Sequence, residues 1–178
     1  DTLVNNKDTV RFSMAANPRL WAQKDYVQLT PGDGEPIMGC IAWRELLFVF
    51  KQTKFFVFYG VGTDSSGNPV FNYRTVDSNI GLASARALCA GRDGVYFMDR
   101  KGVYKTTGAD PQCISDPIEP IWTGDVSPFF HGGVLLHSQI TNTAMNWTNE
   151  RVYVAYTSTS TTNNYMLVFD TRYGWWTL

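Results

Sequence analysis

The sequence predicts an all-β protein, built as a β-propeller-like repeat of four-stranded antiparallel blades. Helical periodicity is nearly absent along the 178 residues. Short runs of aromatic and β-branched residues, which favour strands, alternate with turn formers such as Gly, Asp, Asn and Pro. One strand–turn–strand pattern also occurs three times. A four-stranded unit that recurs every roughly 40–50 residues is typical of propeller blades.

The clearest copy of this unit lies between residues 91 and 115. Its strand-like runs, 95–98 and 103–106, are separated by Arg100-Lys101-Gly102. Glycine-containing turns precede the first run and follow the second, and glycine supplies the positive φ of tight turns. The nearby acidic residues are therefore expected to be turn residues rather than site residues; they are Asp93, Asp99 and Asp110.

The three copies align at a polar turn that precedes an apolar run. Leu46, Gly94 and Arg151 begin the runs LLFVFK, GVYFMD and RVYVAY. Each run is followed by a hairpin partner, FFVFYG, GVYKTTG or YMLVFD, and is preceded by a strand of small or apolar residues. Small residues in the first strand suit the crowded position near a propeller axis. We therefore expect one domain spanning 1–178, with units near 1–30, 36–77, 82–115 and 134–178.

Four strands are expected in each of the last three units. They lie at 37–43, 46–51, 55–59 and 70–76, at 83–89, 95–98, 103–106 and 112–114, and at 135–147, 151–157, 164–169 and 175–178. Two extended runs, 9–13 and 26–29, precede them. This makes three to four blades, whereas propellers typically need about four or more. The predicted ring is therefore small or incomplete, and a β-sandwich with regular hairpins is the alternative.

Composition narrows the classes of partner. Charged residues make up 17% of the chain and the formal net charge is −1, so nucleic acid is not expected as the main partner. No apolar run approaches the roughly 18 residues of a membrane span, and no basic, apolar leader opens the chain. No membrane insertion is expected. The chain starts at Asp1 and stops within the strand-like segment 175–178, which indicates a fragment of a longer protein.

The three cysteines, Cys40, Cys89 and Cys113, are widely and irregularly spaced. This spacing gives neither a disulfide framework nor a zinc signature. Each lies among small or apolar residues, so buried free thiols are expected. Free thiols fit synthesis in a reducing compartment.

No catalytic, cofactor-binding or metal-binding residues are predicted, and the chain is not expected to be an enzyme. The only histidines, His131 and His137, are separated by a spacing that fits no metal motif. Asp116, Glu119 and Asp125 are close in sequence but lie in a proline-rich linker. A glycosidase pair would need carboxylates about 5–10 Å apart. We interpret these residues as solvated or turn-forming.

The order of elements resembles the β-propeller-bearing tail and neck proteins of tailed bacteriophages, of the nozzle or tail-hub type found in short-tailed phages. The likeness covers most of the chain through short motifs. The matching segments are 11–13, 17–18, Trp21, 32–37, 46–51, 55–60, 93–99, 102–104, Gly108, 114–118, Trp122, 151–153, 167–170 and Trp175 or Trp176. The parts of that family that mount the propeller in a ring have no counterpart here.

The resemblance implies a structural virion protein of the tail or head–tail connector, assembled in the host cytoplasm and lodged in the virion. Its expected partners are other phage tail and neck proteins. The full-length protein is expected to form a homo-oligomer around the DNA path used in ejection, with DNA passing through non-specifically. The low charge and high aromatic content fit such packing, because interface cores are depleted in charge and enriched in aromatics.

Two other functions remain open at the level of sequence. One is a carbohydrate- or receptor-binding propeller, in which tryptophans stack on sugars. Its candidate residues are Trp21, Trp43, Trp122, Trp147, Trp175 and Trp176. The other is a glycan-cleaving enzyme that uses Asp64 and Asp125.

Overall fold

The computed structural model describes residues 7–13, 17–21, 25–63, 69–76, 79–124 and 133–177. Asp64, Asp125 and His131, three residues weighed in the sequence, lie outside these ranges. The described chain is all-β, with three four-stranded antiparallel sheets and one two-stranded sheet. The predicted repeat of four-stranded antiparallel units is therefore confirmed, and the sheets do not close into a barrel within the described residues.

Each four-stranded sheet, called a blade below, is a meander in which consecutive strands pair. The first blade contains β3 (Gly39–Trp43), β4 (Leu46–Phe50), β5 (Phe55–Thr63) and β6 (Pro69–Val76). The second contains β7 (Leu88–Gly91), β8 (Gly94–Asp99), β9 (Gly102–Thr106) and β10 (Gln112–Cys113). The third contains β11 (Ala144–Thr148), β12 (Arg151–Tyr156), β13 (Tyr165–Asp170) and β14 (Trp175–Thr177).

Shorter elements complete the described fold. Strands β1 (Thr9–Arg11) and β2 (Tyr26–Gln28) pair with each other and are called the ribbon below. A 3-10 turn at Asp116–Ile118, helix α1 (Pro120–Thr123) and a 3-10 helix at His137–Asn142 connect the second and third blades. None of these helices is long and apolar enough to span a membrane, as far as the described chain extends.

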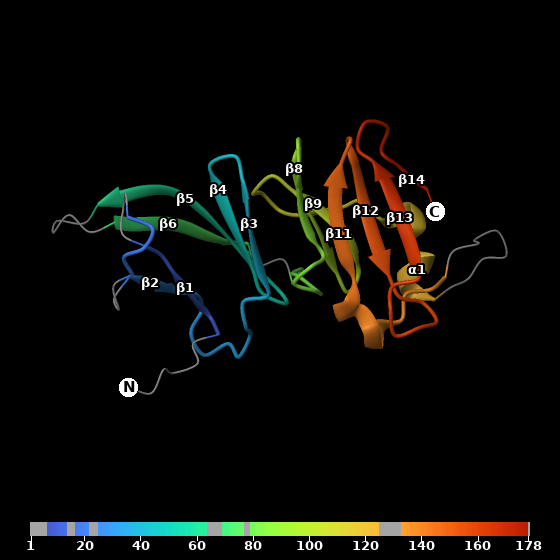
Figure 1. The fold of residues 1–178 in the computed structure, drawn as a ribbon, viewed down its shortest axis with the longest axis horizontal. Coiled ribbons are helices and arrows are strands. Elements are labelled where there is room, and N and C mark those ends of the chain that lie inside the picture. Colours follow the sequence, from blue (N-terminus) through green and yellow to red (C-terminus); the bar gives the residue numbers. More distant parts are fainter. Residues whose placement is uncertain are drawn as a thin grey trace.

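The blades succeed one another along the long axis of the molecule (Figure 1). Their first strands lie side by side, because β7 contacts β3 on one side and β11 on the other. This adjacency of first strands is the propeller-like feature of the fold. It also agrees with the small residues of these strands, since close approach of backbones favours small side chains.

The side chains between the blades follow the alternation of each strand. On β4, Phe48 and Phe50 point toward the second blade, where the Phe50 ring lies 4.8 Å from that of Phe97. On β8, Tyr96 points the other way and its ring lies 6.4 Å from that of Phe169 in the third blade. One continuous hydrophobic core therefore passes through both interfaces.

The ribbon packs on the face of the first blade that points away from the second blade. A separate hydrophobic cluster forms there, with Leu29, Val49, Phe56 and Phe58 buried at its centre. Val10 and Val27 of the ribbon pack against it. Residues 1–30 thus contribute a two-stranded cover, not a four-stranded blade, within the described chain.

Three predictions need correction. The strand expected at 83–89 is confined to Leu88–Gly91, and the strand expected at 135–147 is confined to Ala144–Thr148. The segments before these two strands contact each other instead. Ser84 Oγ lies 2.9 Å and 2.8 Å from the backbone oxygens of Thr141 and Thr143, and its single hydroxyl hydrogen is shared between them. Among the cysteines, which are all free, Cys40 is exposed and Cys113 half-buried, so only Cys89 is buried as expected.

Candidate functional site

The outward face of the third blade is the candidate functional surface. Strand register places two rows of side chains on it, and these rows are Ala144–Ala155–Met166 and Asn146–Tyr153–Val168–Thr177. A third row, Thr148–Arg151–Asp170–Trp175, lies at the end of the blade beside the β11–β12 turn. We call these three rows the third-blade face. The opposite face of the sheet carries Val152, Val154 and Phe169, which are buried against the second blade.

The repeat shows what normally covers this face. The third residues of β4, β8 and β12 are Phe48, Tyr96 and Tyr153. Phe48 and Tyr96 have no exposed surface because the next blade lies on them, whereas Tyr153 is only half-buried. The third-blade face is therefore the equivalent of two surfaces that are covered elsewhere in the same molecule.

Met166 gives the sharpest contrast. It lies on β13 opposite Ala155, as Phe55 lies opposite Phe50 and Val103 opposite Met98. Phe55 and Val103 are fully buried, while Met166 is 52% exposed. An unbranched apolar side chain left in solvent at a core position of the repeat is typical of an interaction surface.

The face is hollowed as well as apolar. A shallow cavity of about 340 Å³ lies on this face, and its lining includes Ala144, Tyr153, Ala155 and Met166. The lining combines the small side chains of Ala144 and Ala155 with the larger ones of Tyr153 and Met166. The surface thus offers a recess to a partner.

Charge on the face is balanced. Arg151 Nε lies 3.4 Å from Asp170 Oδ2, and Arg172 Nη2 lies 3.0 Å from the same oxygen. The hydrogen bonds from Arg172, above all, hold the pKa of Asp170 below its usual range. Covering this row would therefore bury paired charges and would not leave a lone carboxylate without a partner, which is the costly case.

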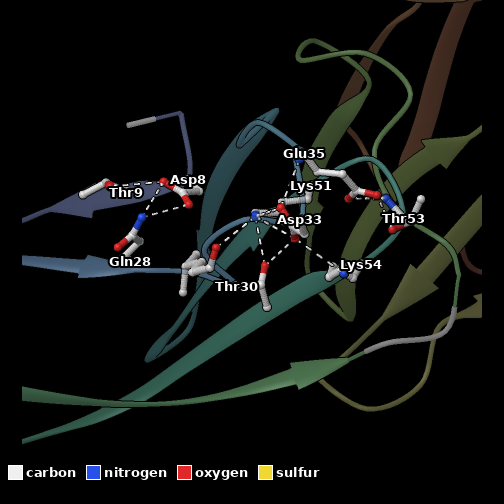
Figure 2. A network of polar contacts seen from close by, with 10 residues as sticks. Asp8, Thr9, Gln28, Thr30, Asp33, Glu35, Lys51, Thr53 and Lys54 are labelled. Carbon is white, nitrogen blue, oxygen red and sulfur yellow. Dashed lines mark hydrogen bonds and ion pairs between the residues drawn. The ribbon is translucent and has the colours of Figure 1, made fainter. Parts of the chain in front are cut away.

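At the other end of the molecule, a polar network fixes the ribbon onto the first blade (Figure 2). Lys51, directly after β4, has a fully buried side chain whose Nζ lies 2.8 Å from Asp33 Oδ1. The same Nζ donates to the Leu29 backbone oxygen and to Thr30 Oγ1, each at 2.9 Å. All its donors thus meet oxygens of the segment that follows β2, and this closes the outer face of the first blade.

The Asp33 carboxylate is held in its charged form by this network. Burial favours the neutral acid, but hydrogen bonds from Lys51, Thr30 and the Glu35 backbone N–H outweigh burial and leave the pKa of Asp33 well below its usual range. The neighbouring Glu35 accepts a 2.7 Å hydrogen bond from Thr53 Oγ1. We interpret this group as a structural anchor.

Among the described residues, the side chains that the sequence offers as catalytic or metal-binding candidates are not brought together. His137 Nε2 donates to the Trp122 backbone oxygen at 2.9 Å. Asp116 and Glu119 are exposed, in the short helical segments that join the second and third blades. Asp93 and Asp99 do more than shape turns, because Asp93 pairs with Lys105 and Asp99 accepts hydrogen bonds from the Gly81 and Lys101 backbones. Across the described ranges no three His, Cys, Asp or Glu residues form a metal-type group.

The tryptophans divide into structural and exposed ones. Trp43 and Trp122 are buried, and Trp176 is half-buried with its Nε1 donating to the Ile114 backbone oxygen at 2.7 Å across the second and third blades. Trp147 is half-buried and packs against the core. Trp21 and Trp175 are more than half exposed. Trp21 and Trp175 are therefore the exposed candidates for sugar stacking among the described tryptophans.

Two residues that matter in the structure, Lys51 and Met166, are not among the candidates that the sequence predicts. The alignment of the runs at Leu46, Gly94 and Arg151 contains a signal for Lys51, because it places Lys51 on the same strand face as the buried Val49.

Comparison of this chain with models of known protein families, and with curated proteins, finds no match.

Proposed function

We propose that this chain is a non-catalytic scaffold module of a tailed-bacteriophage tail or head–tail connector. Its stacked blades form a rigid block beside the DNA path, and the third-blade face docks a neighbouring virion subunit. DNA passes without sequence-specific contact, and the parent protein is a homo-oligomer lodged in the virion after assembly in the host cytoplasm. The phage assignment rests on the sequence resemblance described above.

One observation carries the docking role, namely the exposure of Met166 at a repeat position where Phe55 and Val103 are fully buried. A scaffold module needs an apolar, shape-complementary surface with little unpaired charge. The third-blade face offers such a surface, with Ala144, Tyr153 and Ala155 around a recess and with Arg151 paired to Asp170.

Co-expression tests the proposal. The chain would be produced together with the portal, neck and tail proteins encoded beside its gene, purified by a tag, and imaged by negative-stain electron microscopy. We expect it to co-purify with at least one of these proteins in a ring-shaped or tail-like particle, and Tyr153→Asp to be lost from that particle. Tyr59→Asp, which changes an exposed tyrosine of the first blade, serves as the control. A gene without portal or terminase neighbours, or a chain that joins none of their products, would contradict the proposal.

A carbohydrate- or receptor-binding role is the second candidate, favoured by one exposed aromatic pair. The rings of Tyr173 and Trp175 lie 5.2 Å apart and both side chains are more than half exposed. Arg172 lies over the Tyr173 ring. A glycan array with the wild type and Trp175→Ala would decide this point, with Trp21→Ala as a control at the other exposed tryptophan. Binding that is lost only in Trp175→Ala supports a sugar platform, and an array without signal removes it.

A further inference from the structure

The ribbon occupies the place that a blade takes elsewhere in the molecule. The fourth residues of β4, β8 and β12 are Val49, Phe97 and Val154, and all three are buried. Phe97 faces the first blade, where the Phe50 ring lies 4.8 Å from its own ring. Val154 lies on the face of the third blade that packs on the second blade. Val49 is at the equivalent position of the first blade, but its cover is the ribbon.

The ribbon is joined to the first blade less extensively than the blades are joined to one another. The three blades share one continuous hydrophobic core, and their first strands lie side by side. The ribbon instead packs on a separate cluster, whose buried side chains are Leu29, Val49, Phe56 and Phe58. Strands β1 and β2 form a sheet of their own, so strand pairing does not join the ribbon to the blade. Separation of the ribbon from the first blade therefore leaves the core between the blades intact.

Side-chain contacts at the two ends of the ribbon complete its attachment. At one end, Lys51 Nζ donates to the Leu29 backbone oxygen at 2.9 Å and pairs with Asp33. At the other end, the Phe12 ring lies 4.5 Å from the Phe71 ring of β6. The ribbon strands pair only with each other, and an isolated two-stranded hairpin is marginally stable at best in water. A ribbon that leaves the blade should therefore unpair, so that both of its strands open together.

We propose that the ribbon opens as one unit while the three blades remain folded, and that this opening uncovers the face of the first blade that carries Val49, Phe56 and Phe58. Segments with few buried apolar contacts open at a lower free energy than the core of the same protein. The three side chains lie on β4 and β5, whose pairing with each other does not involve the ribbon. The molecule then has a closed state and an open state, and only the open state presents this apolar blade face to solvent.

Hydrogen exchange of the native chain at low denaturant concentrations tests the proposal. The Leu29 and Phe12 amides, which donate to the Asp8 and Asp25 backbone oxygens, report on the ribbon, and the Ile114 amide, which donates to the Val103 oxygen, reports on the second blade. We expect the two ribbon amides to exchange through one shared opening that depends weakly on denaturant, because this dependence scales with the surface exposed. The Ile114 amide should exchange more slowly and with a steeper dependence. Ribbon and blade amides with the same opening free energy and the same denaturant dependence would overturn the proposal.

Two matched substitutions on β2 provide a second measurement. Val27 packs against the cluster under the ribbon, whereas the neighbouring Tyr26 is exposed. We expect Val27→Asp to speed exchange at the Leu29 amide at least about tenfold, because the closed state must then bury a carboxylate, and to leave the Ile114 amide unchanged. Val27→Asp should also bind more of an anilinonaphthalene sulfonate dye, which reports exposed apolar surface, while Tyr26→Asp should match the wild type in both measurements. Equal acceleration at Leu29 and Ile114, or equal effects of the two substitutions, would show that the ribbon does not open separately from the blades.

Discussion

Lys51 Nζ lies 2.8 Å from Asp33 Oδ1, and the Lys51 side chain has no exposed surface while that of Asp33 is 20% exposed. A lysine is rarely buried to this extent unless it is paired. Here the pair joins the end of β4 to the loop after the ribbon, and the Leu29 oxygen completes the site. The outer face of the first blade is thus closed by an ionic contact at its edge and an apolar cluster at its centre.

Removing the buried ammonium should loosen the ribbon. We expect Lys51→Met to lower the free energy of local opening by about 1.5–3 kcal/mol, because the Asp33 carboxylate and the Leu29 oxygen lose a charged donor. Hydrogen exchange at the Leu29 and Ile37 amides, which donate to Asp8 and Lys7 oxygens of the ribbon segment, measures this opening. Lys54→Met is the matched control, since Lys54 Nζ is 3.6 Å from Asp33 and more exposed. Equal effects of the two changes would contradict the anchor.

Acid should release the same contact. The pKa of Asp33 lies below its ordinary value of 3.8, so the folded state binds this proton less readily than the unfolded chain. Its contribution to stability is therefore present above pH 3.8 and is lost as the pH falls from 3.8 toward the lowered pKa. We expect the protection factor of the Leu29 amide to fall over that range in the wild type but not in Asp33→Asn. Thermal unfolding of the whole protein would not isolate the contribution of Asp33, because Asp93 and Asp170 also have lowered pKa values.

The strands could be predicted because local pattern determines them. The aligned runs starting at Leu46, Gly94 and Arg151 are the second strands of the three blades. The conformation of the segments before β7 and β11 could not be predicted in the same way. Ser84 is hydrogen-bonded to backbone oxygens of Thr141 and Thr143, which lie more than fifty residues away in the chain. No local pattern encodes a contact of that range.

The candidate surface depends even less on local sequence. Ala155 and Met166 belong to an ordinary alternating strand pair, and nothing in their neighbourhood distinguishes them from Phe50 and Phe55. Their exposure follows from the absence of a covering blade among the described residues, which is a property of the whole arrangement. Lys51 is similar, because its burial requires the Leu29 backbone, 22 residues earlier in the chain.

Gly91 should tolerate no side chain. A Cβ atom there would lie 2.8 Å from Trp147 Nε1 and 2.9 Å from Tyr96 Cε2, both at the interface of the second and third blades. We expect Gly91→Ala to lower the free energy of unfolding by about 1–3 kcal/mol through overpacking. Chemical denaturation followed by circular dichroism measures the change.

Gly62→Ala is the control for this substitution. Its Cβ would meet only the Val70 backbone oxygen, at an ordinary 3.9 Å. We expect the free energy of unfolding of Gly62→Ala to equal that of the wild type or to exceed it by about 0.4–1 kcal/mol, because alanine restricts the unfolded chain more than glycine does. Equal losses from both substitutions would show that the steric argument at Gly91 is wrong.

The cysteines should differ sharply in reactivity. Cys40 is exposed on β3, whereas Cys89 is buried and burial raises the pKa of its thiol to about 12. Because the thiolate is the reactive species, an aromatic disulfide reagent at pH 8 should modify Cys40 rapidly in the native protein. Cys89 should react only after denaturation. Cys40→Ser should remove the rapid phase, and persistence of that phase in the variant would show that Cys40 is not the reactive thiol and that this prediction is wrong.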